Sequence, residues 1–477
     1  MTGGDLTDLT DLTVGIDIGT TSVKALAVDA EGTVVAATRV PHPLRAAPGR
    51  LEHDAEAAWR TGVCDAYGAV ATGSRDALGD SANIAAVSVT AMVPSLTAVD
   101  AGGRPCTAGL LYGDARGAGA VGVDPASAGE AAGFLRWLAA AAPDAAGFWP
   151  AQAVANRALC GRAAVDFATA WCANPLFDGQ GWSAEVLEAA GARPEQLPDV
   201  IAGDGPVGRM GGTGGGADDG TGPLVGPGTV DALAAQYVAG ADQAGDVLVI
   251  LGATLIVWAV VPGWVERPGL WTVPHTAPGL CLVGGASNAG GLFVDWASRL
   301  FADPPGTIDL TVPGDDVPVW LPYLRGERTP IHRADLRAEL SGLHIGHGRA
   351  ELRRATYEAS GFVARRIVER AYPPDEAPRP RRIVAVGGGV RAPGWVQALA
   401  DCTGLEVDVA AVPDASALGA AFLARCTAGL ESQATAGRRW ARTASTAGPD
   451  PAWTGPCHER YRRFLARTMA TETGESA

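Results

Sequence analysis

The segment VGIDIGTTSVKALAVD, residues 14–29, decides how the rest of the sequence is interpreted. An apolar strand ends in Asp17, a Gly-Thr-Thr turn follows at residues 19–21, and Lys24, the only lysine of the chain, comes soon after. Backbone N–H groups, hydroxyls, a carboxylate and an ammonium group can together hold a polyphosphate and its metal ion. The spacing is neither the Walker pattern nor GxGxxG. The residues alone indicate a phosphate-binding turn or an ordinary Gly/Thr hairpin.

The surrounding pattern is that of α/β domains, because short apolar runs alternate with longer Ala/Leu-rich stretches of helical period. Residues 24–36 continue as a second hairpin, so the chain opens strand, turn, strand, turn, strand. The run Val247–Leu251 precedes a Gly-Ala-Thr turn at 252–254 and another apolar run, which repeats the plan of the first motif. Ile383–Val386 opens into three glycines, and glycine lets a flat ligand or another backbone approach closely. We expect a nucleoside there, although tight turns also use glycine without any ligand.

Two acidic residues are candidates for chemistry. Asp231 lies in the first turn of an expected helix, where the helix dipole favours an ionised carboxylate. Such a group can take the proton of a hydroxyl that attacks phosphorus, but an N-terminal capping acid has the same pattern. Asp114 lies in LLYGDARG two residues before Arg116, which places an acceptor and a donor for hydroxyl groups together. A surface salt bridge has that pattern too.

Composition and charge exclude several classes of protein. The chain has 477 residues, 47% hydrophobic and 19% charged, which suits two or three globular domains. With 37 Lys+Arg against 52 Asp+Glu the net charge is −15, and no basic run is present, so we expect no nucleic-acid partner. The longest apolar run, Val247–Val261, is shorter than the ~20 residues of a membrane span, so we expect no membrane association.

The cysteines and the first residues indicate a cytoplasmic protein. Eight scattered cysteines without a CxxC pair favour buried free thiols in a reducing compartment. The acidic start, MTGGDLTDLTDLT, has no basic region ahead of an apolar core, so it is not a signal peptide. Oligomeric state is open, and a homodimer is the expectation only because dimers are common.

Further segments complete an ordered series from about Val14 to Ala424: GRLEHDAEAAW (49–59), SVTAMVPSLTAVDAGGRPCTAGLLYGDAR (88–116), VWLPYLRGERTP (319–330), GGGVRAPGWVQALADCTGLEVDV (387–409) and DASALGAAFLA (414–424). The series resembles the FGGY family of carbohydrate kinases, in particular its xylulokinase-like members. The resemblance implies an α/β protein of two actin-like ATPase (ribonuclease H-like) domains with a cleft between them. In that cleft ATP, with Mg²⁺, and a small sugar or polyol would meet.

The resemblance also implies roles for individual residues. Asp231 matches the family's catalytic base, and Asp17 would bear on Mg²⁺. The groups around ATP would be Asp17, Gly19, Thr20, Thr21, Lys24, Gly252 and Thr254 at the phosphates, with Gly388, Gly389 and Gln397 at the adenosine. The sugar would lie at Met92, Asp114 and Arg116. The implied activity is transfer of the γ-phosphate of MgATP to a hydroxyl of a ketose or polyol.

The expected domain ranges follow from the pattern and the resemblance. Residues 1–13 form a frayed tail, 14–243 the N-terminal sugar-binding domain with the catalytic Asp, and 244–426 the ATP-binding domain. Residues 427–477 form a less patterned C-terminal extension. The glycine-dense stretch 202–228 is expected to be a flexible connector, because backbone entropy argues against regular structure there.

Departures from the family pattern leave alternatives open. Ala253 removes a hydroxyl from the second turn, and Thr229 and Val230 replace glycines before the base, where their bulk is expected to narrow its approach. AMVPS, residues 91–95, lacks the histidine of typical xylulokinases. One alternative is a catalytically degenerate sensor of sugar or nucleotide, and another is a kinase for glycerol, ribulose or gluconate. A chaperone-like or actin-like protein is disfavoured, because the ~50 residues after Ala424 are too few for a substrate-binding domain.

Overall fold

The computed structural model describes residues 10–117, 130–211, 221–275, 277, 279–301, 316–412, 414–432 and 438–473. The chain forms two compact units. Unit 1 comprises residues 1–238 and 415–440, and unit 2 comprises residues 239–414 and 441–477. Within the described ranges, no helix has both the length and the apolar character that crossing a membrane requires.

Unit 1 is built on a seven-stranded sheet of order β12–β13–β6–β1–β2–β3, with β14 also paired to β6. Its strands are β1 (Thr10–Ile18), β2 (Ser22–Val28), β3 (Val34–Pro41), β6 (Ala82–Ala91), β12 (Gly208–Arg209), β13 (Leu224–Val225) and β14 (Thr229–Val230). The strands β1, β2 and β3 form consecutive antiparallel hairpins, which confirms the expected opening. The strand β6 runs parallel to β1, and both β13 and β14 run parallel to β6.

A second, five-stranded sheet of unit 1 has the order β4–β5–β8–β7–β9. Its strands are β4 (Leu44–Ala47), β5 (Arg50–His53), β7 (Ser95–Val99), β8 (Gly109–Leu111) and β9 (Gly147–Trp149), and a small pair is formed by β10 (Ala164–Asp166) and β11 (Asp199–Ile201). The helices are α1 (Gly62–Leu78), α2 (Glu130–Ala141), α3 (Ala151–Cys160), α4 (Phe167–Trp171), α5 (Ala184–Ala189), α6 (Asp231–Ala239) and α10 (Ala415–Thr427). The loop after β8 therefore belongs to the same unit as β1 and β6.

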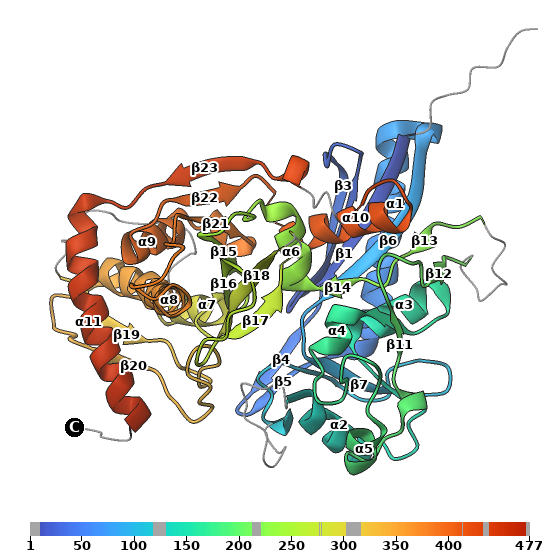
Figure 1. The fold of residues 1–477 in the computed structure, drawn as a ribbon, viewed down its shortest axis with the longest axis horizontal. Helices are drawn as coiled ribbons and strands as arrows, with labels where there is room; N and C mark the ends of the chain where they lie inside the picture. Colours follow the sequence, from blue (N-terminus) through green and yellow to red (C-terminus); the bar gives the residue numbers. More distant parts are fainter. Residues whose placement is uncertain are drawn as a thin grey trace, which may run out of the picture. The chain divides into compact units, whose positions relative to one another are not determined.

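Helix α10 packs against β1 and β6, although most of the chain separates them in sequence (Figure 1). The contact is so close that a Cβ at Gly15 in β1 would lie 1.9 Å from the Ala417 carbonyl oxygen of α10. A Cβ at Gly419 would lie 1.8 Å from the Ala234 carbonyl oxygen of α6. Only glycine fits at these two positions, because no real Cβ approaches backbone atoms so closely.

Unit 2 repeats the plan with a seven-stranded sheet of order β17–β18–β16–β15–β21–β22–β23. Its strands are β15 (Asp246–Leu251), β16 (Leu255–Pro262), β17 (Trp271–Pro274), β18 (Leu280–Ser287), β21 (Arg382–Val386), β22 (Val407–Ala410) and β23 (Thr443–Ala447), and β19 (Val319–Leu321) pairs with β20 (Glu339–Ser341). The helices are α7 (Gly291–Leu300), α8 (Arg349–Ala371), α9 (Pro393–Thr403) and α11 (Pro451–Thr473). As in unit 1, the first two strands form a hairpin, and the first of them runs parallel to a later strand, β21.

A buried charge network joins α8 and α11. The Glu358 carboxylate of α8 accepts hydrogen bonds from Arg354 at 2.7 Å and from Arg460 of α11 at 2.6 Å. Burial alone would raise the pKa of Glu358, but the two guanidinium groups lower it below its ordinary value. Arg354 also donates to Asp401 of α9 at 2.8 Å, so three helices meet at one set of ion pairs. Removing one partner would leave a buried charge uncompensated.

The structure differs from the expected organisation in three respects. Residues 415–440 return to unit 1 because α10 packs on β1, whereas the expectation assigned residues 415–426 to the C-terminal domain and residues 427–440 to the extension. Residues 441–473, expected as part of a less patterned extension, form β23 and the long helix α11 of unit 2. The glycine-dense stretch contains β12 and β13, because pairing with a sheet offsets the entropy of ordering glycine; its residues 212–220 lie outside the described part.

The cysteines are free thiols, as expected, but not all are buried. Cys64 and Cys106 are exposed, while Cys281, Cys402, Cys426 and Cys457 are buried. The remaining two are half-buried.

We predict that Gly15→Ala destabilises the protein by about 3 kcal/mol or more, because the new methyl group would overlap the α10 backbone. Urea unfolding checks this. Gly68→Ala is the matched control, since Gly68 is an exposed position inside α1 with no atom in the way. That control should gain roughly 0.5–1 kcal/mol through helix propensity. Equal stability of Gly15→Ala and the native chain would contradict the close packing of α10 on β1.

Candidate active site

Three parallel strands of unit 1 end at one edge of the main sheet. Asp17 of β1 lies opposite Thr90 of β6, and Thr90 lies opposite Thr229 of β14. Since the strands are parallel and in register, the residues that follow them emerge side by side. Met92 follows β6 directly, and Asp231 follows β14 directly. Ligands of open α/β sheets bind outside such carboxyl edges.

Asp231 begins helix α6, in the position expected for an acid that the helix dipole favours. Its Oδ1 accepts a hydrogen bond from the Ala232 N–H at 2.7 Å. Just before it, the Thr229 hydroxyl donates to the half-buried Asp166 carboxylate at 2.7 Å. Burial raises the pKa of Asp166. Thr229 and Val230 are themselves buried, and the effect of their bulk on the approach to the base stays a prediction.

The turn after β1 has the hairpin geometry expected of the first motif. The Gly19 N–H donates to the Ser22 carbonyl at 3.0 Å, which closes the turn. Lys24 lies opposite Asp17 in the β1–β2 register, and its Nζ is 3.7 Å from the Asp17 Oδ2. An ammonium group and a carboxylate therefore lie together on the two strands that flank the turn with Thr20 and Thr21. The carboxylate and the two hydroxyl oxygens are donors of the kind that a hard cation such as Mg²⁺ takes.

Two side chains, His53 of β5 and Tyr112 directly after β8, hold Thr20 in place. The His53 ring at the end of β5 donates through Nε2–H to the Thr20 carbonyl at 2.8 Å. Its Nδ1 accepts from the Trp59 indole N–H at 3.0 Å, which fixes this tautomer. Burial, helped by the neighbouring His42, lowers the pKa of His53 to about 4, so the ring is neutral at physiological pH. The Tyr112 hydroxyl lies 3.0 Å from the Thr20 hydroxyl.

The Asp114 carboxylate forms hydrogen bonds with other groups of unit 1. Its carboxylate accepts the Leu51 N–H at 2.7 Å, the Arg116 N–H at 3.0 Å and the Arg116 guanidinium at 2.8 and 2.7 Å. Burial would raise the pKa of Asp114, but these hydrogen bonds lower it overall. Arg116 also pairs with Glu52 and lies over the Trp137 ring at 4.7 Å. The pair thus anchors the loop after β8 to β5, and its contact with a sugar stays a prediction.

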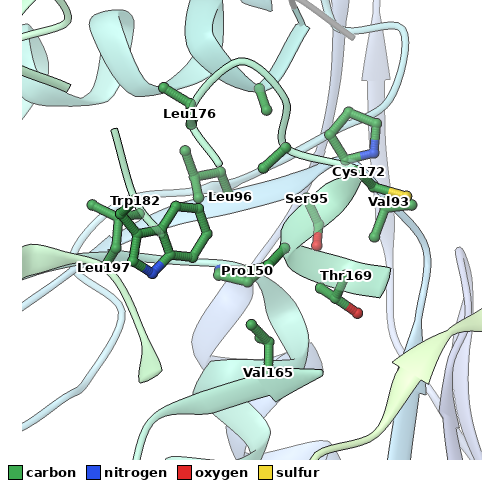
Figure 2. A pocket seen from close by; sticks show the side chains of 14 residues that line it. Val93, Ser95, Leu96, Pro150, Val165, Thr169, Cys172, Leu176, Trp182 and Leu197 are labelled. Carbon is green, nitrogen blue, oxygen red and sulfur yellow. The ribbon is translucent and has the colours of Figure 1, made fainter. Parts of the chain in front are cut away.

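Beside Met92, unit 1 contains a small apolar cavity (Figure 2). Figure 2 shows Val93, Leu96, Pro150 and Trp182 in its wall. Its volume of ≈ 30 Å³ has room for about two waters and is too small for a sugar. Cys172 also lines it, and burial, with the charges of Asp166 and Asp231, raises the pKa of its thiol to about 12. The cavity is therefore a packing gap, and the raised pKa keeps its thiol protonated at neutral pH.

In unit 2, the second Gly/Thr turn and the triple glycine leave neighbouring parallel strands. Ile250 of β15 lies opposite Val386 of β21, so residues 252–254 and 387–389 emerge at the same edge. The Gly252 N–H closes its turn on the Thr254 carbonyl at 3.1 Å. The carbonyls of Gly252 and Ala253 accept from the first N–H groups of α7, at 2.8 and 3.0 Å, which fixes the turn on that helix.

Glycine is required at residues 387 and 389 for different physical reasons, and it is not required at residue 388. Gly387 has φ = 93°, in the left-handed region, and a Cβ there would lie 2.8 Å from the Leu251 carbonyl oxygen. A Cβ at Gly389 would lie 2.6 Å from the Trp395 ring. At Gly388 the nearest atom, on Arg391, is 3.6 Å away, and the residue is exposed. Gly388 is therefore the position of the three at which packing within unit 2 does not require glycine.

Gln397 has partners inside unit 2. Its Nε2 donates to the Asp401 carboxylate and to the Gly448 carbonyl, both at 2.9 Å. These bonds tie α9 to the segment before α11. The assignment of Gln397 to the adenosine stays a prediction.

Glu327, in the VWLPYLRGERTP motif, supports the second turn indirectly, because it binds the residues that lead into α7. Its carboxylate accepts the Ser287 hydroxyl at 2.8 Å, the Asn288 N–H at 2.9 Å and the Arg328 N–H at 2.7 Å. Residues 287–290 lead into α7, whose first N–H groups hold the Gly252 turn. Burial raises the pKa of Glu327 to about 7.

Residues 12–123 match the profile of the N-terminal domain of the FGGY family of carbohydrate kinases, and residues 248–428 match the profile of its C-terminal domain. The chain belongs to the FGGY family of carbohydrate kinases. This confirms the resemblance stated from the motifs. The protein is an enzyme, a phosphotransferase that acts on a sugar hydroxyl and is xylulokinase-like.

Relatives of this kinase span nearly its whole length. The xylulose kinase of Klebsiella pneumoniae is 28% identical over 446 residues, which cover 86% of this chain and 89% of that protein. The structure of xylulose kinase from Rhodospirillum rubrum, 26% identical, superimposes with a TM-score of 0.76 over 98% of this chain and 100% of the other. The structure of gluconate kinase from Lactobacillus acidophilus, 21% identical, reaches 0.78 over 97% and 98% of the two chains. These matches confirm the two-domain actin-like ATPase fold, and because it occurs in kinases of different names, the fold does not select the sugar.

Sequence reasoning missed the residues whose side chains support the candidate site. His53, Tyr112 and Glu327 lie inside the quoted motifs, but nothing in those motifs indicated which atoms they contact. Asp166 was missed as well. The sequence does not show which polar side chains become buried, so it could not indicate which of them must find a hydrogen-bond partner.

We predict that His53→Ala raises the KM of the kinase for ATP more than it lowers kcat, because Thr20 loses the donor on its carbonyl. The variant should also lose about 1–3 kcal/mol of stability, since the buried Trp59 N–H loses its partner. His53→Gln is the matched variant: its amide can donate to Thr20 and accept from Trp59, so it should restore the native KM. Steady-state kinetics and urea unfolding check both. An unchanged KM in a folded His53→Ala protein would contradict the role.

We predict that Glu327 makes the kinase less stable as the pH rises. The folded state raises the pKa of this carboxyl to about 7, so it binds the proton more tightly than the unfolded chain. Its contribution to the unfolding free energy is therefore full below the unfolded pKa and is lost as the pH rises through about 7. Glu327→Gln should remove this part of the pH dependence, measured by urea unfolding between about pH 5 and pH 8. The exposed Glu406→Gln should leave it intact, and identical profiles of Glu327→Gln and native protein would refute the assignment.

Proposed function

We propose that this kinase transfers the γ-phosphate of ATP to a hydroxyl of a ketose of the xylulose type, with Asp231 as the general base. The observation that supports this most directly is the shared carboxyl edge of β1, β6 and β14, where Asp17, Met92 and Asp231 occupy neighbouring positions. A base, a sugar contact and a phosphate turn are then within one unit. Relatives named xylulose kinase over most of the chain's length point to the ketose.

In the proposed reaction, the Asp231 carboxylate takes the proton of the attacking hydroxyl. The sugar oxygen forms a bond to the γ-phosphorus, the bond from that phosphorus to the bridging oxygen of ADP breaks, and the products are a sugar phosphate and ADP. General-base assistance of this kind contributes roughly 10²–10⁴-fold. The rest comes from positioning and charge neutralisation, because phosphoryl transfer passes through a loose transition state.

The phosphates of ATP would lie on the turns of the two units. In unit 1 the candidates are Gly19, Thr20 and Thr21, with Lys24 adding positive charge; in unit 2 they are Gly252 and Thr254. Gly388 and Gly389 would lie at the adenosine. Mg²⁺, held through Asp17, would neutralise charge on the phosphate oxygens. Ala253 leaves Thr254 as the hydroxyl donor of its turn.

We predict that Asp231→Asn lowers kcat by roughly 10²–10⁴-fold and leaves ATP affinity unchanged, because the amide cannot accept the proton. ADP release from MgATP is followed against a panel of xylulose, ribulose, other ketoses, alditols, glycerol and gluconate. Asp65→Asn, at an exposed position on α1, is the matched control and should behave as the native enzyme does.

Turnover with xylulose that disappears in Asp231→Asn supports both parts of the proposal. Turnover with glycerol, ribulose or gluconate alone would replace the substrate while keeping the base. ATP binding without turnover on any sugar would favour the sensor, and near-native turnover of Asp231→Asn would remove Asp231 from the mechanism.

A further inference from the structure

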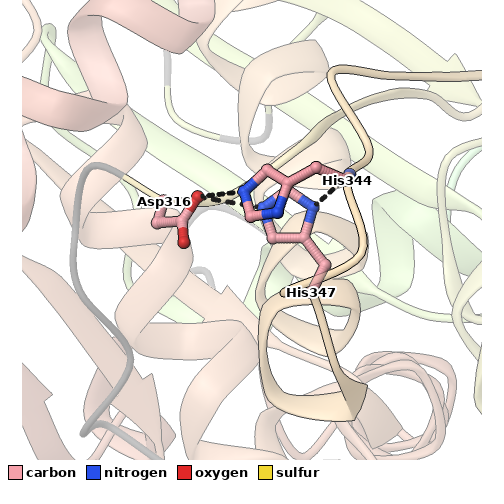
Figure 3. A group of neighbouring side chains, drawn as sticks. All are labelled: Asp316, His344 and His347. Atoms are coloured by element: carbon pink, nitrogen blue, oxygen red, sulfur yellow. Dashed lines mark hydrogen bonds and ion pairs between the residues drawn. The ribbon is translucent and has the colours of Figure 1, made fainter.

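Three side chains of unit 2 that are able to ligate a metal ion converge beyond the end of the β19–β20 pair, and two of them, Asp316 and His344, are exposed (Figure 3). The Asp316 Oδ1 lies 2.8 Å from the His344 Nε2 and 3.0 Å from the His347 Nε2. One ligand atom from each residue falls within 4.8 Å of the others. Among the described residues, this is the single group of three or more His, Cys, Asp or Glu side chains with that property.

The topology explains why residues so far apart in sequence meet. In the antiparallel pair β19–β20, Val319 lies opposite Ser341. Three residues beyond that pair on each strand, the same register places Asp316 opposite His344. His347 follows on the loop that enters α8 at Arg349, and its side chain is only 2% exposed. The β19–β20 pair and the start of α8 thus bring the ligand atoms of Asp316, His344 and His347 together.

We propose that Asp316, His344 and His347 form a binding site for a divalent transition-metal ion of the Zn²⁺ type. Two imidazoles and one carboxylate are donors that such ions favour, and three protein ligands leave the fourth tetrahedral position to water. Mg²⁺ prefers oxygen donors and keeps its waters, so this donor set discriminates against the ion used in phosphoryl transfer. Bound there, the ion would join the open end of the β19–β20 ribbon to the start of α8.

The distances need only a small adjustment to admit an ion. A tetrahedral ion at about 2.0–2.2 Å from each ligand separates the ligand atoms by roughly 3.3–3.6 Å. The two separations from Asp316, 2.8 and 3.0 Å, therefore have to open by about half an ångström. Part of the carboxylate remains exposed, which gives an ion access from solvent.

Binding also requires a change of tautomer. The Nδ1 atoms of His344 and His347 accept N–H groups of Gly346 and His344, both at 3.1 Å, so each Nε2 now carries the ring proton and points it at Asp316. An imidazole that binds an ion through Nε2 carries its proton on Nδ1. The two amides must then turn to water, which an exposed loop permits.

The test is a Zn²⁺ titration of the full-length, tag-free, chelator-treated protein by calorimetry. The native chain should bind one more Zn²⁺ than the Asp316→Asn/His344→Asn/His347→Asn triple variant, and Zn²⁺ should raise the apparent Tm of the native chain only. Each single variant should bind at least about tenfold more weakly. Millimolar Mg²⁺ should not compete. Exposed His458→Asn is the matched control and should bind as the native chain does.

Co²⁺ provides a second readout. Its visible absorption should indicate a four-coordinate nitrogen and oxygen site, without the thiolate charge-transfer band that binding at a cysteine would give. Zn²⁺ binding that is equal in the native and triple-variant chains, or a cobalt spectrum dominated by thiolate, would overturn the site. Sugar-kinase turnover is measured separately and should be native in all these variants, so failure of the metal site is distinguishable from failure of the proposed function.

Discussion

The parallel ladder between β1 and β6 is the constraint on which unit 1 depends. It fixes in register the strand that ends in Asp17 and the strand that leads to Met92, and β14 extends it to Asp231. A slip of one residue would turn every side chain of a strand to the opposite face. Helix α10 can lie against this ladder only because Gly15 has no side chain, so the position of the edge depends on backbone contact as much as on hydrogen bonds.

Unit 2 has the same strand and turn arrangement around its own Gly/Thr turn, residues 252–254. A hairpin ends in a Gly/Thr turn, and the strand before the turn runs parallel to a strand that ends in glycine. In unit 1 the turn is held by side chains, His53 and Tyr112, whereas in unit 2 it is held by the first amides of α7. Two turns of similar sequence are therefore held by different groups. Substitutions of the residues that hold them should act through side chains in unit 1 and through backbone amides in unit 2.

Local patterns predicted the local structure. The hairpins around residues 19–21 and 252–254, the helix at Asp231 and the strand before the triple glycine all follow from apolar runs interrupted by turn residues, and the structure contains each of them. The ordered motifs also predicted the family and the fold. What the sequence could not supply is contact between distant segments: the return of α10 to unit 1, or the ion pairs of Glu358 that bring α11 onto α8. Such contacts depend on tertiary packing, which no local period encodes.

The pairing of Lys24 with Asp17 has a consequence for chemical labelling. Every other basic side chain of the chain is an arginine, so an acylating or reductively alkylating reagent finds one lysine ammonium, and it stands at the phosphate turn. Apart from the label on the α-amino group, the amount of label bound per chain then reports the fraction of chains modified at Lys24. Acetylation of that one residue would remove the positive partner of Asp17 and leave the fold's arginine ion pairs untouched.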